Sequence, residues 1–417
     1  MTSCIYAAIL MAESGKEEET QMKYKTIEDM DLNGKTVLLR GDLNVPAQDG
    51  KVTDTTRIDR LKDTVDYLVK NGAKVLVLSH FGRPKGEKNP EYSLAFLAPV
   101  LAKRWGYPVK FADDCIGEPA KKLAMALKPG EIGLLENVRF YKGEEKNDPE
   151  FIKQLAANGD IFVNDAFSAA HRAHASTEGL AHVMPVAAGF LMRDEIDALT
   201  KALEAPEKPV AAVVGGAKIS TKLDVLNNIS QKVDYLILGG GMANTFAFAK
   251  GIEVGKSLCE KDMADEARRI MKTAEKSGCK IILPIDRVIV SELKEGASYE
   301  ISTSDNMPAD KESIDIGPQS IAEISKILEK CKTVLWNGPM GVFEIKPFDK
   351  GTNEVAKKVA ELTKAGRILS VAGGGDTVSA LENAGVADKF SYISTAGGAF
   401  LEWMEGKVLP GVAALGG

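Results

Sequence analysis

Cationic side chains follow several apolar runs in the first half of this 417-residue chain. The runs at 37–40, 75–80, 133–137 and 161–165 have the apolar character of buried parallel strands. Ligands of parallel α/β sheets bind at the carboxyl ends of the strands, so side chains placed there meet at one edge. Singly, each cation would be a solvated surface residue. Together they predict an anion site, because guanidinium groups bind carboxylate and phosphate through two parallel hydrogen bonds. The residues concerned are Arg57, His80, Arg83, Arg139, His171 and Arg172.

Glycines follow the apolar runs of the second half, in VAAVVGGAK (210–218), LGGGM (238–242) and AGGGDT (372–377). Glycine lets backbone N–H groups approach a phosphate closely, and a following helix N-terminus favours negative charge. Lys218 and Lys222 are four residues apart, which places them on one helical face. A plain strand-to-helix turn with solvated lysines is the alternative interpretation of any one cluster. The recurrence of the clusters favours a phosphate site.

Asp376 comes directly after the third glycine cluster, where a helix is expected to begin. Aspartate is a common helix N-cap. A carboxylate beside a phosphate site is also where Mg²⁺ binds, held by one or two carboxylates together with phosphate oxygens. The two interpretations are compatible.

The elements that must position these residues alternate between strands and amphipathic helices, which is typical of βαβ units with parallel strands. Further strands are expected at 109–112, 210–214, 235–238, 280–284, 333–336, 367–371 and 391–394, and an irregular polar excursion at 290–312. The stretch 186–204 has helical spacing and separates the two halves. The sequence therefore predicts an α/β fold with two Rossmann-like domains, each a parallel sheet flanked by helices, joined by a helical hinge. The expected boundaries are 1–21, a flexible extension; 22–185, the first domain; 186–204, the interdomain helix; 205–404, the second domain; and 405–417, a tail that packs back on the first domain.

The composition argues against nucleic-acid-binding, membrane-spanning and secreted classes of protein. The chain has 44% hydrophobic and 27% charged residues and a net charge of −6, which argues against a nucleic-acid partner. The longest uncharged apolar runs are too short to span a bilayer, and residues 1–21 lack the features of a signal peptide. The chain has five cysteines, an odd number, and no CxxC motif, so we expect reduced thiols and a cytoplasmic protein. We also expect no membrane partner.

Two other nucleotide motifs do not fit. GIEVGKS (251–257) has three residues between its glycines where a Walker loop has four, and it follows a helix. The chain contains no GxGxxG, which removes the main support for a dinucleotide-dependent dehydrogenase.

The motifs in their order resemble the phosphoglycerate kinase family, from about Asp31 to Gly417. The stretches that carry the resemblance are RGDLNVP, SHFGRP, LLENVRF, DAFSAAHRAH, GFLM, GGAKISTK, GGGMANTF, WNGPMGVFE and AGGGDT. The chain departs from the usual family pattern at Gly41, Leu43, Ser168, Ala396 and Phe400.

The resemblance implies transfer of the acyl phosphate of 1,3-bisphosphoglycerate to MgADP, giving 3-phosphoglycerate and MgATP, and the reverse reaction. It makes 22–185 the phosphoglycerate-binding domain and 205–404 the nucleotide-binding domain of a monomer. It places Asp42, Asn44, Arg57, His80, Arg83, Arg139 and Arg172 around the phosphoglycerate, with His171 nearby. It places Gly216, Ala217, Gly240, Gly241, Leu258, Gly317, Asn337, Pro339 and Glu344 around the nucleoside. It places Lys218, Lys222, Gly373, Gly374, Gly375, Asp376 and Thr377 at the phosphates, with Asp376 on Mg²⁺. Arg57, Lys218 and Gly375 are the implied catalytic residues.

The residues alone also allow a second class of function. A non-catalytic, hinge-type sugar-phosphate binding protein would also have two domains and a cationic site. Such a protein needs one ligand site, and it leaves Lys218, Lys222 and Asp376 without a role.

Overall fold

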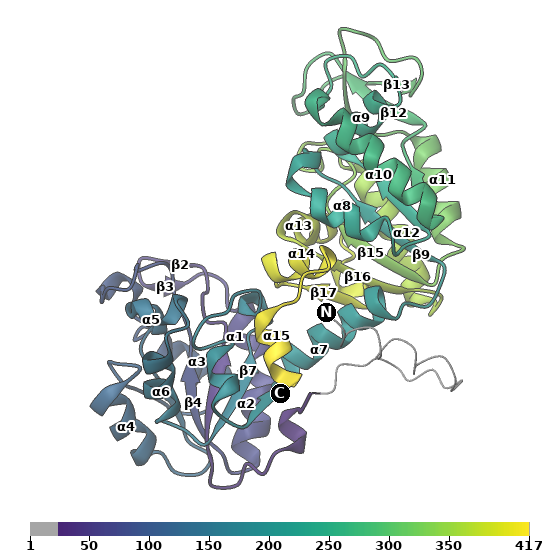
Figure 1. The fold of residues 1–417 in the computed structure, drawn as a ribbon. Coiled ribbons are helices and arrows are strands. Elements are labelled where there is room, and N and C mark those ends of the chain that lie inside the picture. The colour runs from purple at the N-terminus through teal and green to yellow at the C-terminus, as the bar shows by residue number, and fades with distance from the viewer. Residues whose placement is uncertain (1–23, 417) are drawn as a thin grey trace, which may run out of the picture.

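A computed structural model describes residues 24–416, so the extension expected at 1–21 lies outside the described residues. Two six-stranded parallel sheets form the two lobes of the molecule (Figure 1). The first sheet has the order β5-β6-β4-β1-β7-β8, with strands Val109–Phe111, Ile132–Leu134, Lys74–Leu78, Thr36–Gly41, Ile161–Asp165 and Val186–Ala188. The second has the order β11-β10-β9-β15-β16-β17, with strands Lys280–Ile282, Tyr235–Leu238, Val210–Val214, Thr333–Asn337, Leu369–Gly373 and Tyr392–Ser394. The predicted fold class is confirmed.

Helices cover both faces of each sheet, and alternate residues of the strands supply the two cores. In β1, Val37 and Leu39 pack with one set of helices while Leu38 packs with another. The helices of the first lobe are α1 (Thr56–Arg60), α2 (Lys62–Lys70), α3 (Leu97–Trp105), α4 (Gly117–Ala126), α5 (Lys142–Glu145) and α6 (Pro149–Ala156). Those of the second lobe are α8 (Leu223–Ile229), α9 (Gly240–Ala249), α10 (Ala264–Ser277), α11 (Pro318–Leu328), α12 (Lys350–Lys364), α13 (Gly375–Asn383) and α14 (Gly398–Met404). A short hairpin, β2 (Ala47–Gln48) and β3 (Lys51–Val52), follows β1.

Sequence periodicity identified every strand of the second sheet and all but one strand of the first. It missed a separate antiparallel sheet of order β13-β12-β14, with β12 at Asp286–Val290, β13 at Glu300–Thr303 and β14 at Glu312–Ile316. The interpretation of 290–312 as an irregular excursion is therefore wrong at β13 and at the start of β14. The two edge strands are short and rich in polar residues, so their hydrophobic pattern is weak.

The prediction of one continuous helix over 186–204 is wrong at its start. Residues Val186–Ala188 form β8, the edge strand of the first sheet, and Gly189 is the N-cap of α7 (Phe190–Leu199). A π-helical turn at Thr200–Glu204 continues α7 toward the second lobe. Three apolar residues before a helix fit a strand and a helical turn equally well, and only the neighbouring strand β7 decides between them.

The chain passes between the lobes a second time at its C-terminal end (Figure 1). After α14 in the second lobe, α15 (Pro410–Ala413) lies against the first lobe, where the Gly411 amide donates to the Ala170 carbonyl at 2.9 Å. One hydrophobic cluster joins the lobes, since it contains Met192 and Ile196 of α7, Phe167 after β7 and Phe400 of α14. Within residues 24–416, no helix is long and apolar enough to cross a membrane.

We expect Gly189→Ala to destabilise the protein by about 1–3 kcal/mol, the usual cost of overpacking. A Cβ at Gly189 would lie 2.3 Å from Cγ of Asp165, whose Oδ1 accepts from the Met192 amide at 2.9 Å. The backbone itself is compatible with alanine, since φ of Gly189 is −73°. Urea unfolding measures the effect. Gly398→Ala is the matched control, because its Cβ would meet the His171 ring at an ordinary 3.7 Å. Equal stability of the two variants would contradict the steric argument.

Candidate active site

The cationic side chains of the first lobe come together at the carboxyl edge of its sheet. Arg57 of α1 anchors this edge: its Nη1 donates to Asp42 Oδ2 at 2.8 Å and to the Asn44 carbonyl at 2.9 Å. Asn44 in turn accepts from the Gly82 amide at 2.9 Å through Oδ1. The loops after β1 and β4 are thus tied together through Asn44, with Arg57 bound to the first of them.

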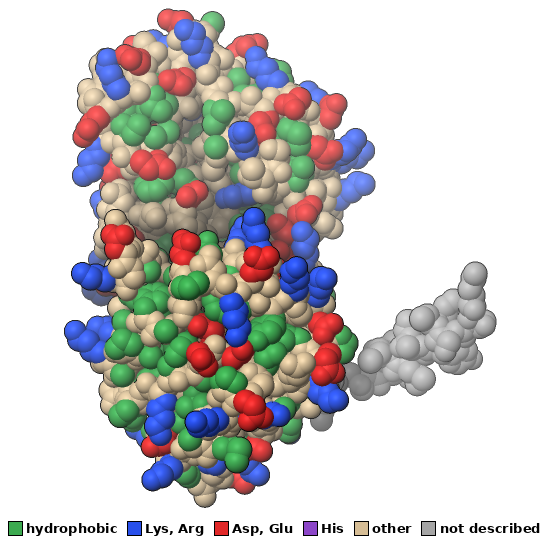
Figure 2. Space-filling view, turned by 90° about the vertical axis from the view of Figure 1, so that its left-hand side faces the viewer, with side chains coloured by type: hydrophobic (Ala, Val, Ile, Leu, Met, Phe, Trp, Pro, Cys, Tyr) green, Lys and Arg blue, Asp and Glu red, His purple; other side chains and the backbone are tan. Residues whose placement is uncertain are grey.

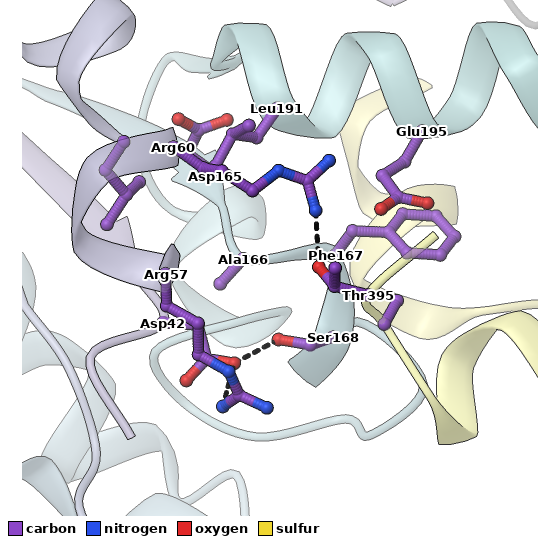
Figure 3. A pocket seen from close by; sticks show the side chains of 12 residues that line it. Asp42, Arg57, Arg60, Asp165, Ala166, Phe167, Ser168, Leu191, Glu195 and Thr395 are labelled. Carbon is purple, nitrogen blue, oxygen red and sulfur yellow. Dashed lines mark hydrogen bonds and ion pairs between the residues drawn. The ribbon is translucent and has the colours of Figure 1, made fainter. Parts of the chain in front are cut away.

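Ser168 adds a contact to Asp42 that glycine could not make. Its hydroxyl donates to Asp42 Oδ2, the same oxygen that Arg57 contacts (Figure 3). Asp42 therefore holds the loop after β7 as well as the start of α1.

His80 is buried and held by Arg40, a residue that sequence analysis did not assign to the site. Nη2 of Arg40 lies 2.8 Å from Nδ1 of His80, and Nε of Arg40 donates to the Ser176 hydroxyl at 2.9 Å. Burial is the main cause that lowers the pKa of His80 well below its usual value, and the neighbouring arginines lower it further. His80 is therefore neutral at pH 7. Its Nδ1 then accepts from Arg40, which leaves the proton on Nε2.

Arg139 carries a buried donor without a hydrogen bond at this edge, although Nε forms an ion pair with Oε1 of Glu145 at 3.6 Å. Its Nη1 donates to the Gly82 carbonyl at 2.9 Å, whereas its buried Nε makes no hydrogen bond. His171 has a buried Nδ1 in the same condition, and the Nε donor of Arg172 lies 3.1 Å from its Nε2. Arg83 and Arg172 are exposed. Unpaired buried donors are costly, so an anion bound here would satisfy groups that the protein leaves open.

The glycines of the second lobe allow its turns to pack backbone against backbone. A Cβ at Gly215 would lie 1.8 Å from the Pro339 carbonyl oxygen, and one at Gly240 would lie 2.6 Å from the Gly216 oxygen. Gly240 also has a φ of +67°, which disfavours any other residue. The turns after β9, β10 and β15 therefore converge without side chains between them.

A cavity of about 280 Å³ opens where these turns meet the N-terminus of α13. The predicted phosphate residues that line it are Lys218, Lys222, Gly374, Gly375, Asp376 and Thr377, with Gly216, Ala217, Asn337 and Pro339 beside them. Nζ of Lys222 donates to the Gly215 carbonyl at 2.7 Å, and Thr377 Oγ1 accepts from the Gly338 amide at 2.7 Å. Backbone amides, two lysines and a helix N-terminus are the groups that bind phosphate.

A larger cavity of about 410 Å³ adjoins the first, because both are lined by Gly216, Ala217, Pro339 and Asp376. Gly240, Gly241, Leu258 and Glu344 also line the larger cavity. Two predicted residues line neither cavity. Gly373 lies under the ring of Phe400, and Gly317 lies against the Asp286 carboxylate at the start of α11.

The comparison with protein families decides the assignment. The family model described as phosphoglycerate kinase matches residues 27–407. The chain belongs to the phosphoglycerate kinase family. The phosphoglycerate kinase of Rhodospirillum centenum is 62% identical over 395 residues, which is 95% of this chain and 100% of that protein. The phosphoglycerate kinase of Ruegeria sp. is 61% identical over 394 residues, 94% of this chain and 100% of that protein. The solved structure of phosphoglycerate kinase from Coxiella burnetii matches with a TM-score of 0.88 at 42% identity, covering 94% of this chain and 99% of that one.

Within this phosphoglycerate kinase fold, Arg60 and Glu195 are residues between the lobes that sequence analysis missed. Arg60 lies one helical turn after Arg57, and its guanidinium donates to the Thr395 hydroxyl (Figure 3). The same guanidinium donates to the Tyr392 hydroxyl at 3.2 Å. Glu195 of α7 is buried nearby, and burial raises its pKa to about 7. Both residues line a cavity together with Asp42, Arg57 and Ser168. No local signal could have found them, because Arg60 and Thr395 are 335 residues apart.

The two anion-binding groups belong to different cavities of the phosphoglycerate kinase fold. Arg57 lines the cavity beside α7, whereas Lys218 lines the cavity beneath α13. The surface between the lobes is hollowed (Figure 2). In this conformation the two cavities share no lining residue and are separate.

We expect nucleoside diphosphate binding to take up a proton near pH 8. Burial lowers the pKa of Lys222 to about 8, and Asp376 opposes this shift. A bound phosphate favours the ammonium form and raises that pKa, so affinity should fall as pH rises above about 8. Titration calorimetry in buffers of different ionisation enthalpy measures the uptake. Lys222→Arg is the control, because arginine does not titrate in this range. A pH dependence that persists in that variant would contradict the assignment.

Proposed function

We propose that this chain catalyses the reversible transfer of the acyl phosphate of 1,3-bisphosphoglycerate to MgADP, giving 3-phosphoglycerate and MgATP. One observation carries the proposal. Cationic side chains gather at the carboxyl edge of one sheet, and a cavity lined by glycines and two lysines lies at the edge of the other. Transfer of a phosphoryl group between two anions needs both sites in one protein. The family to which the chain belongs supports the same reaction.

The first lobe is proposed to bind the phosphoglycerate. Arg83, Arg139 and Arg172 supply guanidinium groups for its stable phosphate, and the absence of a hydrogen bond to Nε of Arg139 supports that role. Asp42 and Asn44 accept from its hydroxyl group. Neutral His80 donates from Nε2 while Arg40 holds its other nitrogen. Arg57 is fixed by Asp42 next to this site, so its remaining donors are free to meet the carboxylate end of the substrate.

The second lobe is proposed to bind the nucleotide. The smaller cavity takes the phosphates on Lys218, Lys222 and the amides that begin α13, from Gly374 to Thr377. The adjoining larger cavity takes the nucleoside between the glycine turns, with Glu344 accepting from the ribose hydroxyls. Gly373 and Gly317 support the turn and the start of α11 behind these surfaces.

The transfer step is proposed to need closure of the lobes. The reaction moves a phosphoryl group between two oxygens, and the protein contributes positioning and charge neutralisation instead of a nucleophile. Arg57 and Lys218 approach the transferred group from opposite lobes, while the amide of Gly375 adds a donor at the N-terminus of α13. Because Arg57 and Lys218 line different cavities here, they act together only after closure. Closure also excludes the water that would hydrolyse the acyl phosphate.

Asp376 is the residue proposed to hold Mg²⁺ with the nucleotide. It lines both cavities and is exposed, and among the described residues no cluster of three or more His, Cys, Asp or Glu side chains forms a metal site. One carboxylate with phosphate oxygens and waters fits the way proteins bind Mg²⁺. Bound there, the ion would neutralise charge on the phosphates.

We also propose that the protein acts as a monomer in the cytoplasm. Both halves of the site come from one chain, so catalysis requires no second copy. The cysteines at 115, 259, 279 and 331 are all free thiols, which suits a reducing compartment. The hinge-type binding protein is not favoured, because it leaves Lys218, Lys222 and Asp376 without a function.

A coupled assay for ATP formation from 1,3-bisphosphoglycerate and ADP tests the proposal. Arg57→Ala and Lys218→Ala should each lower kcat by roughly 10²–10³, the scale of losing one preorganised donor, with smaller changes in KM. Lys272→Ala, an exposed lysine of α10 that lines neither cavity, is the control and should keep full turnover. An unchanged kcat with a raised KM in the two site variants would refute their catalytic roles.

The metal assignment has a separate test. The interpretation of Asp376 as an N-cap is wrong, because Gly374 is the N-cap of α13, no side chain caps the helix, and Asp376 lies in its first turn. Asp376→Asn should therefore keep the helix start. It should lose most of the affinity that Mg²⁺ adds to ADP binding, since an amide offers one neutral oxygen. Calorimetric titration of ADP with and without Mg²⁺ measures this gain in both proteins. The same gain in variant and wild type would show that Asp376 does not hold the metal ion.

A further inference from the structure

Arg287 is a buried arginine whose role neither the fold nor the proposed reaction explains. It lies on β12, the central strand of the small antiparallel sheet, and is 2% exposed. Its Nε and Nη1 atoms are buried and have no hydrogen-bond partner. No carboxylate among residues 24–416 lies within ion-pair distance of it. Burial alone lowers the pKa of its guanidinium.

A buried guanidinium without a partner lowers the stability of the folded protein. An unpaired buried charge costs several kcal/mol, and a hydrophobic residue of similar size is often more stable at such a site. The apolar packing of this sheet does not need Arg287, because the local cluster is built on Val288, Val290, Ile314 and Phe348. Side chains alternate along a strand, so Arg287 is on the face opposite Val288. The unsatisfied guanidinium therefore calls for a ligand with hydrogen-bond acceptors.

The position of Arg287 indicates which class of ligand would accept hydrogen bonds from it. It lines the 410 Å³ cavity that adjoins the phosphate cavity, together with Asn244 of α9 and Ser313 of β14. Among the described residues lining this larger cavity, Arg287 is the only lysine or arginine. A nucleotide with its phosphates on Lys218 and Lys222 places its base in this space. Guanidinium is a donor only, and a purine ring presents acceptors at N1, N3 and N7.

Two carboxylates of β14 also line the cavity. Asp315 already accepts from the Ile316 amide at 2.8 Å and the Gly351 amide at 2.6 Å, so its oxygens are engaged. Glu312 lines the same cavity and makes no side-chain hydrogen bond within the described residues. The remaining walls combine glycines and apolar side chains such as Leu258 and Met340 with the polar residues Asn244, Ser313 and Glu344. Arg287 is best suited to recognise a ring nitrogen, because its Nε and Nη1 donors have no hydrogen-bond partner.

We propose that Arg287 donates a hydrogen bond to a purine ring nitrogen of the bound nucleotide and so determines base selectivity at this site. The inference rests on the proposed function, because it takes the larger cavity as the nucleoside site. Arg287 is a binding residue remote from the transferred phosphoryl group. Its loss should therefore raise the KM for ADP and leave kcat nearly unchanged.

The test compares binding of MgADP, its 1-deaza, 3-deaza and 7-deaza analogues, and ribose 5-diphosphate to the full chain by calorimetry. In the wild type, the analogue that lacks the contacted nitrogen should bind about 10-fold or more weakly than ADP, the scale of a hydrogen bond to a charged donor. Arg287→Met should bind ADP about as weakly as that analogue and no longer distinguish the two. Ribose 5-diphosphate should bind both proteins equally. Arg287→Lys, which keeps a cationic donor group, should recover part of the affinity, and Lys272→Met, at an exposed position of α10 that does not line the cavity, is the control.

Several results would overturn the inference. The first is that the wild type binds all three deaza analogues as tightly as ADP. The second is that Arg287→Met keeps normal affinity for ADP. The third is that Arg287→Met loses as much affinity for ribose 5-diphosphate as for ADP. Inorganic phosphate that stabilises the wild type but not Arg287→Met, without nucleotide, would identify an anion site instead. Should Arg287→Met not fold, the wild-type analogue series decides alone. A wild type that binds no ADP would reject the proposed function and this inference together, whereas normal ADP binding without base discrimination rejects only the inference.

Discussion

The concentration of positive charge at the edge of the first sheet is the constraint on which the rest of the structure depends. Arg40, Arg139, His80 and His174 are buried or nearly so, and Glu144 is the buried carboxylate that offsets them through Ser176. Burial and mutual repulsion lower the pKa of His174 to about 4 and keep His80 neutral. The charge is tolerated because strand ends and backbone hydrogen bonds fix each group. An anionic substrate then enters a site that is already organised and gains the donors left unpaired.

In the second lobe, the groups suited to bind an anion are mainly backbone amides, whereas in the first lobe they are guanidinium groups. Three glycine turns pack so closely that a Cβ at Gly215 or Gly240 would overlap carbonyl oxygens. This packing brings amides, Lys222 and the start of α13 to one cavity. The lobes thus differ in chemistry while sharing a parallel-sheet plan: one concentrates formal charge, and the other concentrates backbone dipoles. A reaction between two phosphate-bearing ligands benefits from the difference, because the nucleotide site does not add to the repulsion in the first lobe.

The connection between the lobes is built from apolar packing crossed by a few polar contacts. Met192 and Ile196 of α7 share a core with Phe400 of α14, so movement of one lobe shifts this shared layer. Arg60 crosses the boundary to Thr395 and Tyr392, and buried Glu195 lies among the same groups. Oε2 of Glu195 has no hydrogen-bond partner. Polar contacts that are few and incompletely satisfied can rearrange at lower free-energy cost than a closed network, which is compatible with the proposed closure of the lobes.

The sequence by itself determined the parallel sheets, the chemistry at each strand end and the family. Buried parallel strands are continuous apolar runs, and side chains that follow them are fixed at one edge, so Arg57, His80, Lys218 and Asp376 could be assigned to sites from local pattern and resemblance. Tertiary structure decided what depends on contacts between distant residues. Residues 186–188 became a strand because β7 pairs with them, and β13 formed because β12 offers it a partner. Arg40, Arg60 and Arg287 carry no local signal of function: each is an arginine in or beside an ordinary element. Arg40 and Arg60 are marked by burial and by partners up to 335 residues away, and Arg287 by buried donors without a hydrogen bond, none of which a linear pattern contains.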